Sequence, residues 1–130
     1  MSAPTCPYCG RPAELVHGSD VFPLRHALHH GQAYLCEPCD AYVGCHPGST
    51  KPVGRLANAE LRRMQTAARE VFNQVWQSGD KSRPGAFLWL AAKLGIPGAE
   101  CHINLFDVET CLRVITICNE RKAKKQRGAR

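Results

Sequence analysis

Apolar residues recur every three to four positions between residues 59 and 77, which is the spacing of one face of an α-helix. At 100° per residue they fall within an arc of about 140°. They are Leu61, Met64, Ala68, Val71, Phe72, Val75 and Trp76. Asn58 is a favourable N-cap and Gly79 a favourable terminator. The pattern therefore predicts an amphipathic helix over residues 59–77, with Arg62 and Arg69 together at one edge of its apolar face.

Two further helices follow in the pattern. Residues 84–94 begin with a proline, which the first helical turn tolerates, and end before Gly95. Residues 86–92 are apolar almost all round, so we expect this helix to be central and buried. Asp107 is a strong N-cap for a third helix that ends near Glu120. Cys111 and Cys118 lie on its apolar face, where free cysteines are expected to pack as core residues.

The first fifty residues are different, because they are rich in Cys, His, Pro and Gly and contain few large aliphatic residues. Short β-like stretches occur at 13–17, 33–36 and 41–45. We expect an α+β protein with a zinc-ribbon-like β subdomain at 1–50 and a connector at 51–57. A small three-helix region at 58–120 and a disordered basic tail at 121–130 complete the expected organisation.

The excess positive charge is concentrated in that tail. The chain has 17 basic and 11 acidic residues, a net charge of +6, and residues 121–130 contain six of the basic residues and no acid. A cationic tail suits a polyanion such as nucleic acid, and the alternative is a solubilising end. No secretory signal precedes Cys6, and the longest apolar run is too short to span a membrane. We therefore expect a cytoplasmic protein, whose thiols stay reduced.

The strongest chemical pattern is a pair of C-x2-C motifs separated by 26 residues. The first is Cys6-Pro7-Tyr8-Cys9-Gly10 and the second is Cys36-Glu37-Pro38-Cys39. Two residues between cysteines allow both sulfurs to reach one ion, and four thiolates form a tetrahedral zinc site. Disulfides would need an oxidising compartment, and a redox motif would need a thioredoxin-like context. The pattern predicts one structural Zn²⁺ held by Cys6, Cys9, Cys36 and Cys39.

Two Cys-His dipeptides remain, at residues 45–46 and 101–102. A second metal site made from Cys45, His46, Cys101 and His102 is disfavoured, because neighbouring residues on a strand point to opposite faces. The alternative of a catalytic cysteine activated by histidine and oriented by Asp107 has no supporting motif such as a nucleophile elbow. The zinc site has no open position for an activated water. We therefore expect that the protein is not an enzyme.

Candidate nucleic-acid contacts come from loops, the first helix and the tail. Residues 44–50 contain two glycines, a proline and two hydroxyl side chains, so their backbone can approach a phosphate closely. The alternatives are a turn that closes the ribbon and, for the helix arginines, a solvated flank. The candidate residues are Arg25, His46, Ser49, Thr50, Arg62, Arg69, Lys122, Lys124, Lys125 and Arg127.

Several of these segments resemble a family of small zinc-finger-containing proteins of bacteria and phages, of unassigned function. The resemblance rests on the first C-x2-C motif, on residues 41–48, 60–62, 89–91, 94–95, 101–103 and 106–107, and most specifically on the Gly-Cys-His-Pro-Gly segment at 44–48. It implies zinc binding and a phage or prophage setting, and it implies no activity. Arg69 and Asn104 stand where the resemblance leads us to expect histidine and glycine.

Together these features favour a small zinc-binding module that binds nucleic acid as an accessory or regulatory protein. The alternative is a protein-binding module, such as a phage inhibitor of a host enzyme, because the first 120 residues have no net charge. Neither hypothesis includes a membrane or a small-molecule substrate.

Overall fold

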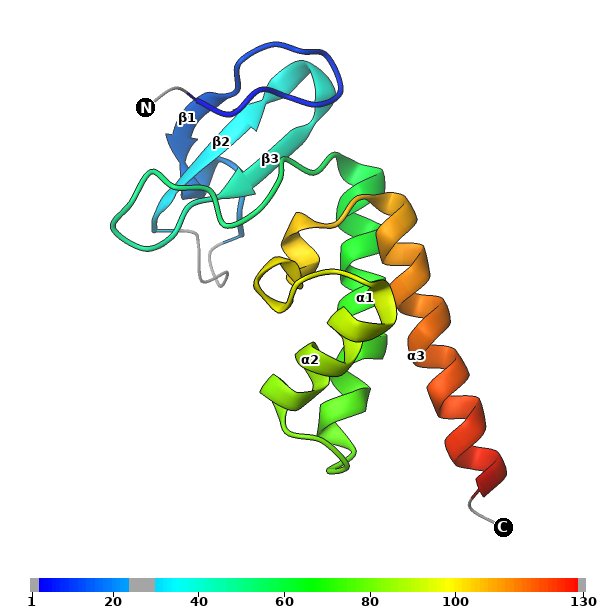
Figure 1. The fold of residues 1–130 in the computed structure, drawn as a ribbon. Helices are drawn as coiled ribbons and strands as arrows, with labels where there is room; N and C mark the ends of the chain where they lie inside the picture. Colours follow the sequence, from blue (N-terminus) through cyan, green and yellow to red (C-terminus); the bar gives the residue numbers. More distant parts are fainter. Residues whose placement is uncertain (1–2, 24–29, 129–130) are drawn as a thin grey trace. The chain divides into compact units, whose positions relative to one another are not determined.

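The computed structural model describes residues 3–23 and 30–128, and the chain divides into two compact units (Figure 1). The N-terminal unit is Met1–Arg62 and the helical unit is Arg63–Arg130. The first contains a three-stranded sheet and the second contains most of the helical residues, which confirms the α+β class. The N-terminal unit extends beyond residue 50 and includes the expected connector.

The sheet is antiparallel, with strand order β1-β2-β3. The strands are β1 (Glu14–His17), β2 (Gln32–Cys36) and β3 (Ala41–Gly44), each within one residue of an expected β-like stretch. β2 is central, and Cys36 at its end lies opposite Ala41 at the start of β3. The tight connection between these two strands therefore places a zinc ligand at the edge of the hairpin.

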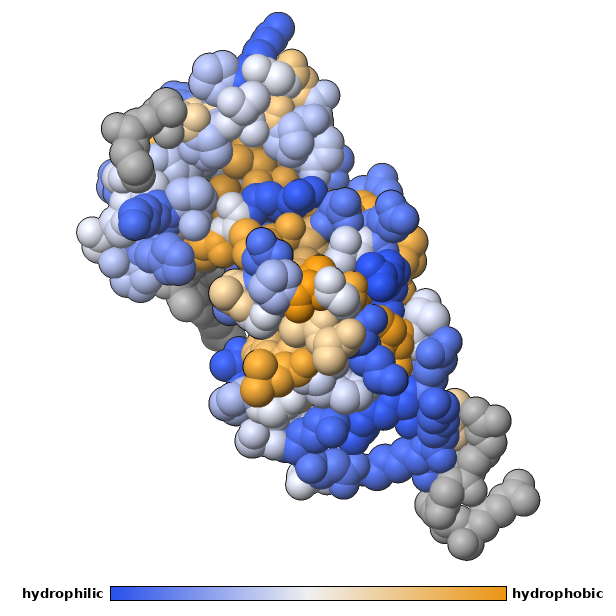
Figure 2. Space-filling view, viewed as in Figure 1, coloured by the Kyte–Doolittle hydropathy of each residue, from blue (hydrophilic) through white to orange (hydrophobic). Residues whose placement is uncertain are grey.

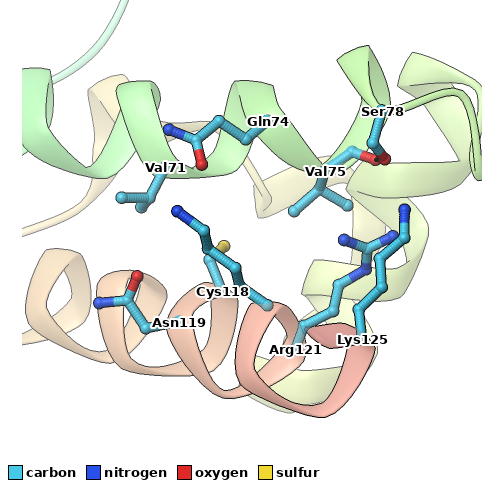
Figure 3. A pocket seen from close by; sticks show the side chains of 9 residues that line it. Val71, Gln74, Val75, Ser78, Cys118, Asn119, Arg121 and Lys125 are labelled. Atoms are coloured by element: carbon cyan, nitrogen blue, oxygen red, sulfur yellow. Dashed lines mark hydrogen bonds between the residues drawn. The ribbon is translucent and has the colours of Figure 1, made fainter. Parts of the chain in front are cut away.

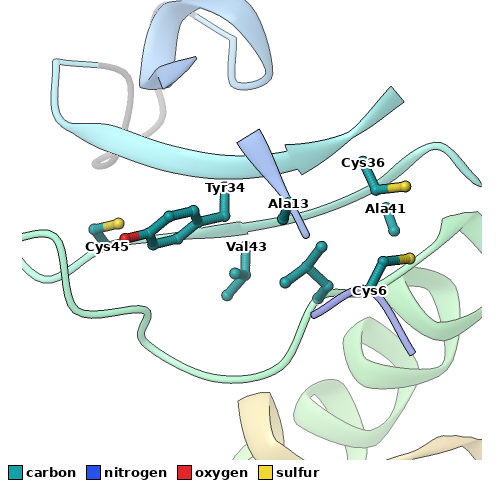
Figure 4. Packing of buried hydrophobic residues seen from close by; sticks show 8 residues of the cluster. Cys6, Ala13, Tyr34, Cys36, Ala41, Val43 and Cys45 are labelled. Carbon is teal, nitrogen blue, oxygen red and sulfur yellow. The ribbon is translucent and has the colours of Figure 1, made fainter. Parts of the chain in front are cut away.

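The core of the N-terminal unit is small (Figure 4). Only a few of its buried side chains are large, among them Tyr34, Val43 and Leu56, and the others are alanines and cysteines. Two of these cysteines, Cys6 and Cys36, are members of the C-x2-C motifs. A core of this size supplies little hydrophobic free energy, so we expect a bound metal to contribute much of the stability of the unit.

The connector at 51–57 lies along the free edge of β3. Tyr42 and Ala57 exchange two backbone hydrogen bonds of 3.1 and 3.0 Å, and the Val53 N–H donates to the Gly44 carbonyl at 2.9 Å. These bonds satisfy backbone groups that an edge strand otherwise leaves open. The segment is therefore irregular but firmly attached.

Helix α1 (Ala59–Gln77) has the predicted bounds. Its N-cap is Asn58, whose side-chain oxygen accepts a 3.0 Å hydrogen bond from the Leu61 N–H. Four of the seven predicted apolar positions are buried and the other three are half-buried. Gln65 is also buried, and its amide donates to the Phe106 carbonyl at 3.2 Å and to the Asn104 carbonyl at 3.4 Å.

Helix α2 (Arg83–Leu94) begins after Ser82, whose hydroxyl accepts a 3.1 Å hydrogen bond from the Gly85 N–H. It ends at Gly95, which has a φ of 72°. The expectation that this helix is buried all round is wrong, because Leu88 is 66% exposed. Its buried residues lie on one side, so the continuous apolar run forms a helix with one buried face and one exposed face. The link to the next helix contains the short turns Gly98–Glu100 and Ile103–Leu105.

Helix α3 (Val108–Gly128) starts after the predicted cap Asp107, which accepts a 2.8 Å hydrogen bond from the Thr110 N–H. Cys111 and Cys118 are buried in the core as expected. The expectation of a disordered tail is wrong for residues 121–128, which continue the helix. Lys, Arg, Ala and Gln are good helix formers, and Arg121 and Lys125, one turn apart, both pair with the Asp80 carboxylate.

The surface over the last turns of α3 is hydrophilic and borders a hollow (Figure 2). Among the helices that the structure describes, none is long and apolar enough to cross a membrane.

Candidate metal centre

The four motif cysteines come together in the N-terminal unit. Their sulfur atoms all lie within 4.8 Å of one another, and the Cys9 and Cys36 sulfurs are 3.6 Å apart. Sulfurs at tetrahedral corners 2.3 Å from a zinc ion would be about 3.8 Å apart, so the cluster has the right size for the ion. The sulfurs of Cys6 and Cys36 point to the same end of the core (Figure 4). Within the described residues this is the one group of three or more potential metal ligands.

The first motif is a tight turn that precedes β1. The Gly10 N–H donates to the Cys6 carbonyl at 2.9 Å, and the Cys6 N–H donates to the Arg11 carbonyl at 2.8 Å. Gly10 has a φ of 79°, a conformation that glycine adopts without strain. This glycine lets the chain reverse directly after Cys9, so both sulfurs face the same point.

The second motif has the same left-handed position directly after its second cysteine. Cys36 ends β2, the residues Glu37–Cys39 form one 3-10 turn, and Asp40 follows with a φ of 50°. The Asp40 N–H donates to the Glu37 carbonyl at 3.1 Å. Aspartate is among the few residues other than glycine that tolerate this region of backbone space. Asp40 thus has the conformational role in this motif that Gly10 has in the first.

The thiols have unequal proton affinities. Burial, and after it hydrogen bonds with the neighbouring cysteines, raise the pKa of the Cys39 thiol to about 12. Burial also raises the pKa of Cys36. Burial acts upward on Cys6 too, but hydrogen bonds with the Tyr8 and Cys9 backbone lower its pKa to about 7. Such a cluster keeps protons at neutral pH unless a cation replaces them, and a divalent zinc ion does so.

A family model supports this assignment independently. The model of DUF3268, a zinc-finger-containing domain, matches residues 2–121. The chain belongs to this family. Searches among curated proteins and solved structures gave no significant match. The four cysteines of this zinc-finger-containing domain therefore form a single site for one structural Zn²⁺.

The two Cys-His dipeptides lie in different units of the zinc-finger-containing domain. Cys45 and Cys101 are buried, whereas His46 and His102 are exposed. Burial raises the pKa of both thiols, which keeps them protonated. The His102 ring lies 6.3 Å from the Phe87 ring. Each dipeptide thus has a buried cysteine beside an exposed histidine.

The loop at 44–50 forms a turn stabilised by hydrogen bonds of Ser49 and of Tyr34 on β2. The Ser49 hydroxyl accepts a 2.9 Å hydrogen bond from the Lys51 N–H, and the Tyr34 hydroxyl donates to the Thr50 carbonyl at 2.9 Å. His46 and Thr50 are exposed and Ser49 is half-buried. The Thr50 side chain and the His46 ring are therefore available to a partner of this unit.

The two helix arginines both have partners within their own unit. Arg62 donates to the carbonyls of Asp40 and Ala57 at 2.6 and 2.7 Å, and its guanidinium lies 4.1 Å from the Tyr42 ring centre. Arg69 is half-buried and donates to the Asn104 side chain. Burial lowers the pKa of Arg69. Their predicted contact with nucleic acid stays a prediction, and each has a structural partner that the sequence did not reveal.

The remaining candidates are Arg25 and the basic residues at the end of α3. Arg25 is outside the described residues, and the structure describes Arg127 only as part of α3. Lys122, Lys124 and Lys125 are exposed on the last turns of that helix.

Sequence reasoning missed Asp40 and Tyr8 as supports of the site. The Tyr8 hydroxyl, within the first motif, accepts a 3.2 Å hydrogen bond from the Asn58 N–H. The sequence did indicate a role for Asp40, because this residue follows Cys39 as Gly10 follows Cys9.

Proposed function

We propose that this zinc-binding chain is a nucleic-acid-binding module whose phosphate contacts come mainly from the helical unit. The observation that supports this proposal is the unequal distribution of charge between the two units. Residues 1–62 contain five basic and five acidic residues, whereas residues 63–130 contain 12 basic and six acidic residues. The entire net charge of +6 therefore belongs to the helical unit. A concentrated positive charge attracts polyanions and speeds association with them.

The basic residues of α3 are suited to this role. Lys122, Lys124 and Lys125 are exposed within one helical turn, so their ammonium groups start from fixed backbone positions. An ordered helix loses less conformational entropy on contact with phosphates than a disordered tail does. Contacts of this kind position a protein on nucleic acid without reading its sequence.

The zinc-binding unit contributes a second, weaker set of contacts in the proposal. His46, Ser49 and Thr50 lie on one turn of a neutral unit, so they add hydrogen bonds and little electrostatic attraction. Arg62 and Arg69 are assigned structural roles instead, because both are half-buried and bound to partners in the fold, whereas the Lys125 side chain is 49% exposed although it pairs with Asp80.

A binding function also agrees better with the chemistry of the site than catalysis does. Four thiolates complete the coordination of zinc and leave no position for an activated water. Cys45 and Cys101 are buried and their pKa values are raised by that burial, which opposes formation of a nucleophilic thiolate. We accordingly propose no catalytic residue.

The test is fluorescence anisotropy with labelled single- and double-stranded DNA and RNA. We expect binding at micromolar protein in about 50 mM salt and a steep loss of affinity as salt rises. Replacing Lys122, Lys124 and Lys125 with Gln should reduce the slope of log affinity against log salt by about 2 to 3. The matched control replaces Lys51 and Arg55, two exposed basic residues of the N-terminal unit, and should change the slope less.

Absence of binding to every nucleic acid at low salt would overturn the proposal. The protein-partner alternative would then be pursued by capture from a host lysate with and without nuclease. A partner retained by the nuclease-treated, lysine-substituted protein would support that alternative.

A further inference from the structure

Basic side chains lie beside aromatic rings on the surface of the helical unit, in one group around Trp89 and another around Arg83. The Lys81 ammonium and the Arg121 guanidinium each lie 6.0 Å from the centre of the Trp89 ring. The Arg83 guanidinium lies 5.3 Å from the Phe87 ring and 6.0 Å from the Trp76 ring. These residues come from α1, the α1–α2 turn, α2 and α3, so the fold assembles the surface from separate segments.

The three aromatic rings are partly exposed to solvent. Trp76, Phe87 and Trp89 are all half-buried, which fixes their orientation while leaving part of each ring open to solvent. A ring in this setting offers an apolar face, and the cations beside it attract anions. Segments 78–89 and 119–128 together contain seven basic residues and two acidic ones, so the surroundings are strongly positive.

Arg121 also links this surface to a cavity between α1 and α3 (Figure 3). The cavity has a volume of about 190 Å³, below the roughly 300–1,000 Å³ of sites that enclose drug-sized ligands. Val71, Val75 and Cys118 supply apolar lining, and the amides of Gln74 and Asn119 supply donors and acceptors. A cavity with these features suits one planar polar group, such as a nucleobase, rather than a whole cofactor.

We infer that this surface binds single-stranded nucleic acid, with Trp89 as a stacking platform for a base. The inference rests on the proposed function and adds the form of the nucleic acid and the residues that select it. Lys81, Arg83 and Lys122 contact phosphates, and the α1–α3 cavity receives a neighbouring base. Paired bases inside a duplex do not expose their faces for stacking, whereas every base of a single strand does.

Asp80 makes the inference testable by a gain of affinity. Its carboxylate pairs with Arg121 at 2.9 Å and with Lys125, so a phosphate must compete with it for both cations. Asp80→Asn removes the competitor and should tighten binding of a single strand by up to about 5-fold, the worth of an exposed ion pair. The matched control is Glu109→Gln, which changes the net charge equally but lies on the first turn of α3, and it should tighten binding less.

Stacking is tested at Trp89 with a poly-dT oligonucleotide and a duplex of equal length. Trp89→Leu should weaken binding of the single strand by about 5- to 150-fold, and Trp89→Phe should retain part of the affinity. Leu88→Ala, at the exposed neighbour on the same helix, is the control and should have little effect. In the Trp76→Phe variant Trp89 is the one remaining tryptophan, and its fluorescence should be quenched on binding.

The outcomes separate this inference from the function on which it rests. Equal affinity for single strand and duplex, with no effect of Trp89→Leu, would overturn the stacking surface and leave phosphate binding standing. Unquenched Trp89 fluorescence in a saturated single-strand complex would also overturn it, and this measurement does not depend on the folding of the leucine variant. Absence of binding to any nucleic acid would remove both the inference and the proposed function.

Discussion

The Arg62 side chain binds both the backbone carbonyl and the side-chain carboxylate of Asp40. One guanidinium nitrogen donates to the Asp40 carbonyl at 2.6 Å, and another lies 3.0 Å from its carboxylate. Asp40 directly follows the zinc ligand Cys39 and has a positive φ, so it occupies a conformation that needs support from its surroundings. The arginine also donates to the Ala57 carbonyl at 2.7 Å. The start of α1 and the second zinc-binding motif are thus bound to the same guanidinium.

This relationship predicts that Arg62 contributes to zinc affinity without touching the ion. Arg62→Ala removes the donor that fixes Asp40, and groups that orient metal ligands typically affect affinity by about 10- to 100-fold. We expect a loss near the lower limit, because the Asp40 side chain is 69% exposed and water can replace part of the interaction. Competition with a chromophoric chelator measures it. Arg63→Ala, which removes the same charge from the next and more exposed residue, should leave the affinity unchanged.

Zinc content and folding of the N-terminal unit should be inseparable. Protein purified without added metal should contain about one zinc per chain. Cys36→Ser should lose that zinc and unfold the small-cored N-terminal unit, while α1 to α3 keep most of their structure. Amide exchange resolves the two units. Protection of residues 6–23 and 32–45 in the variant that equals wild type would contradict the coupling, as would less than half an equivalent of zinc in the folded, reduced wild type.

Zinc affinity should rise steeply with pH. Burial raises the pKa of Cys36 and Cys39, so both thiols of the metal-free protein are protonated at neutral pH. Zinc binds thiolates, so binding releases at least these two protons, and the apparent affinity should rise about 100-fold between pH 7 and 8. The sign follows from the raised pKa values, which favour the metal-free form as pH falls. Chelator competition at the two pH values tests it, and a rise of 10-fold or less would show that fewer protons are displaced.

The sequence predicted features that depend on neighbouring residues and missed those that depend on distant ones. Asn58 and Asp107 identified the starts of α1 and α3 because a cap acts within three residues. The C-x2-C spacing identified the zinc ligands for the same reason. The end of α3 was misjudged because its stability involves Asp80, which lies 41 and 45 residues before its partners Arg121 and Lys125. Arg62 was interpreted as a helix flank because its partner Asp40 lies 22 residues before it, and Gln65 was not identified because its partner Phe106 lies 41 residues after it.

Arg69 and Asn104 illustrate the same limit and give a final prediction. These are the two positions that depart from the family resemblance, and in the structure the Arg69 guanidinium donates to the Asn104 side-chain oxygen. Because Arg69 is half-buried, loss of the oxygen that accepts its hydrogen bond should destabilise the wild-type protein more than a variant with histidine at residue 69. Asn104→Gly should therefore destabilise the wild-type helical unit by about 1.5–3 kcal/mol. In an Arg69→His background the same change should cost less, with a coupling energy of about 0.5–3 kcal/mol.

Both tryptophans, Trp76 and Trp89, lie in the helical unit, so urea unfolding of the zinc-loaded protein followed by their fluorescence reports the stability of this unit. Equal destabilisation by Asn104→Gly in the two backgrounds would show that the pair is not coupled, and the contact would then contribute nothing to the stability of the fold.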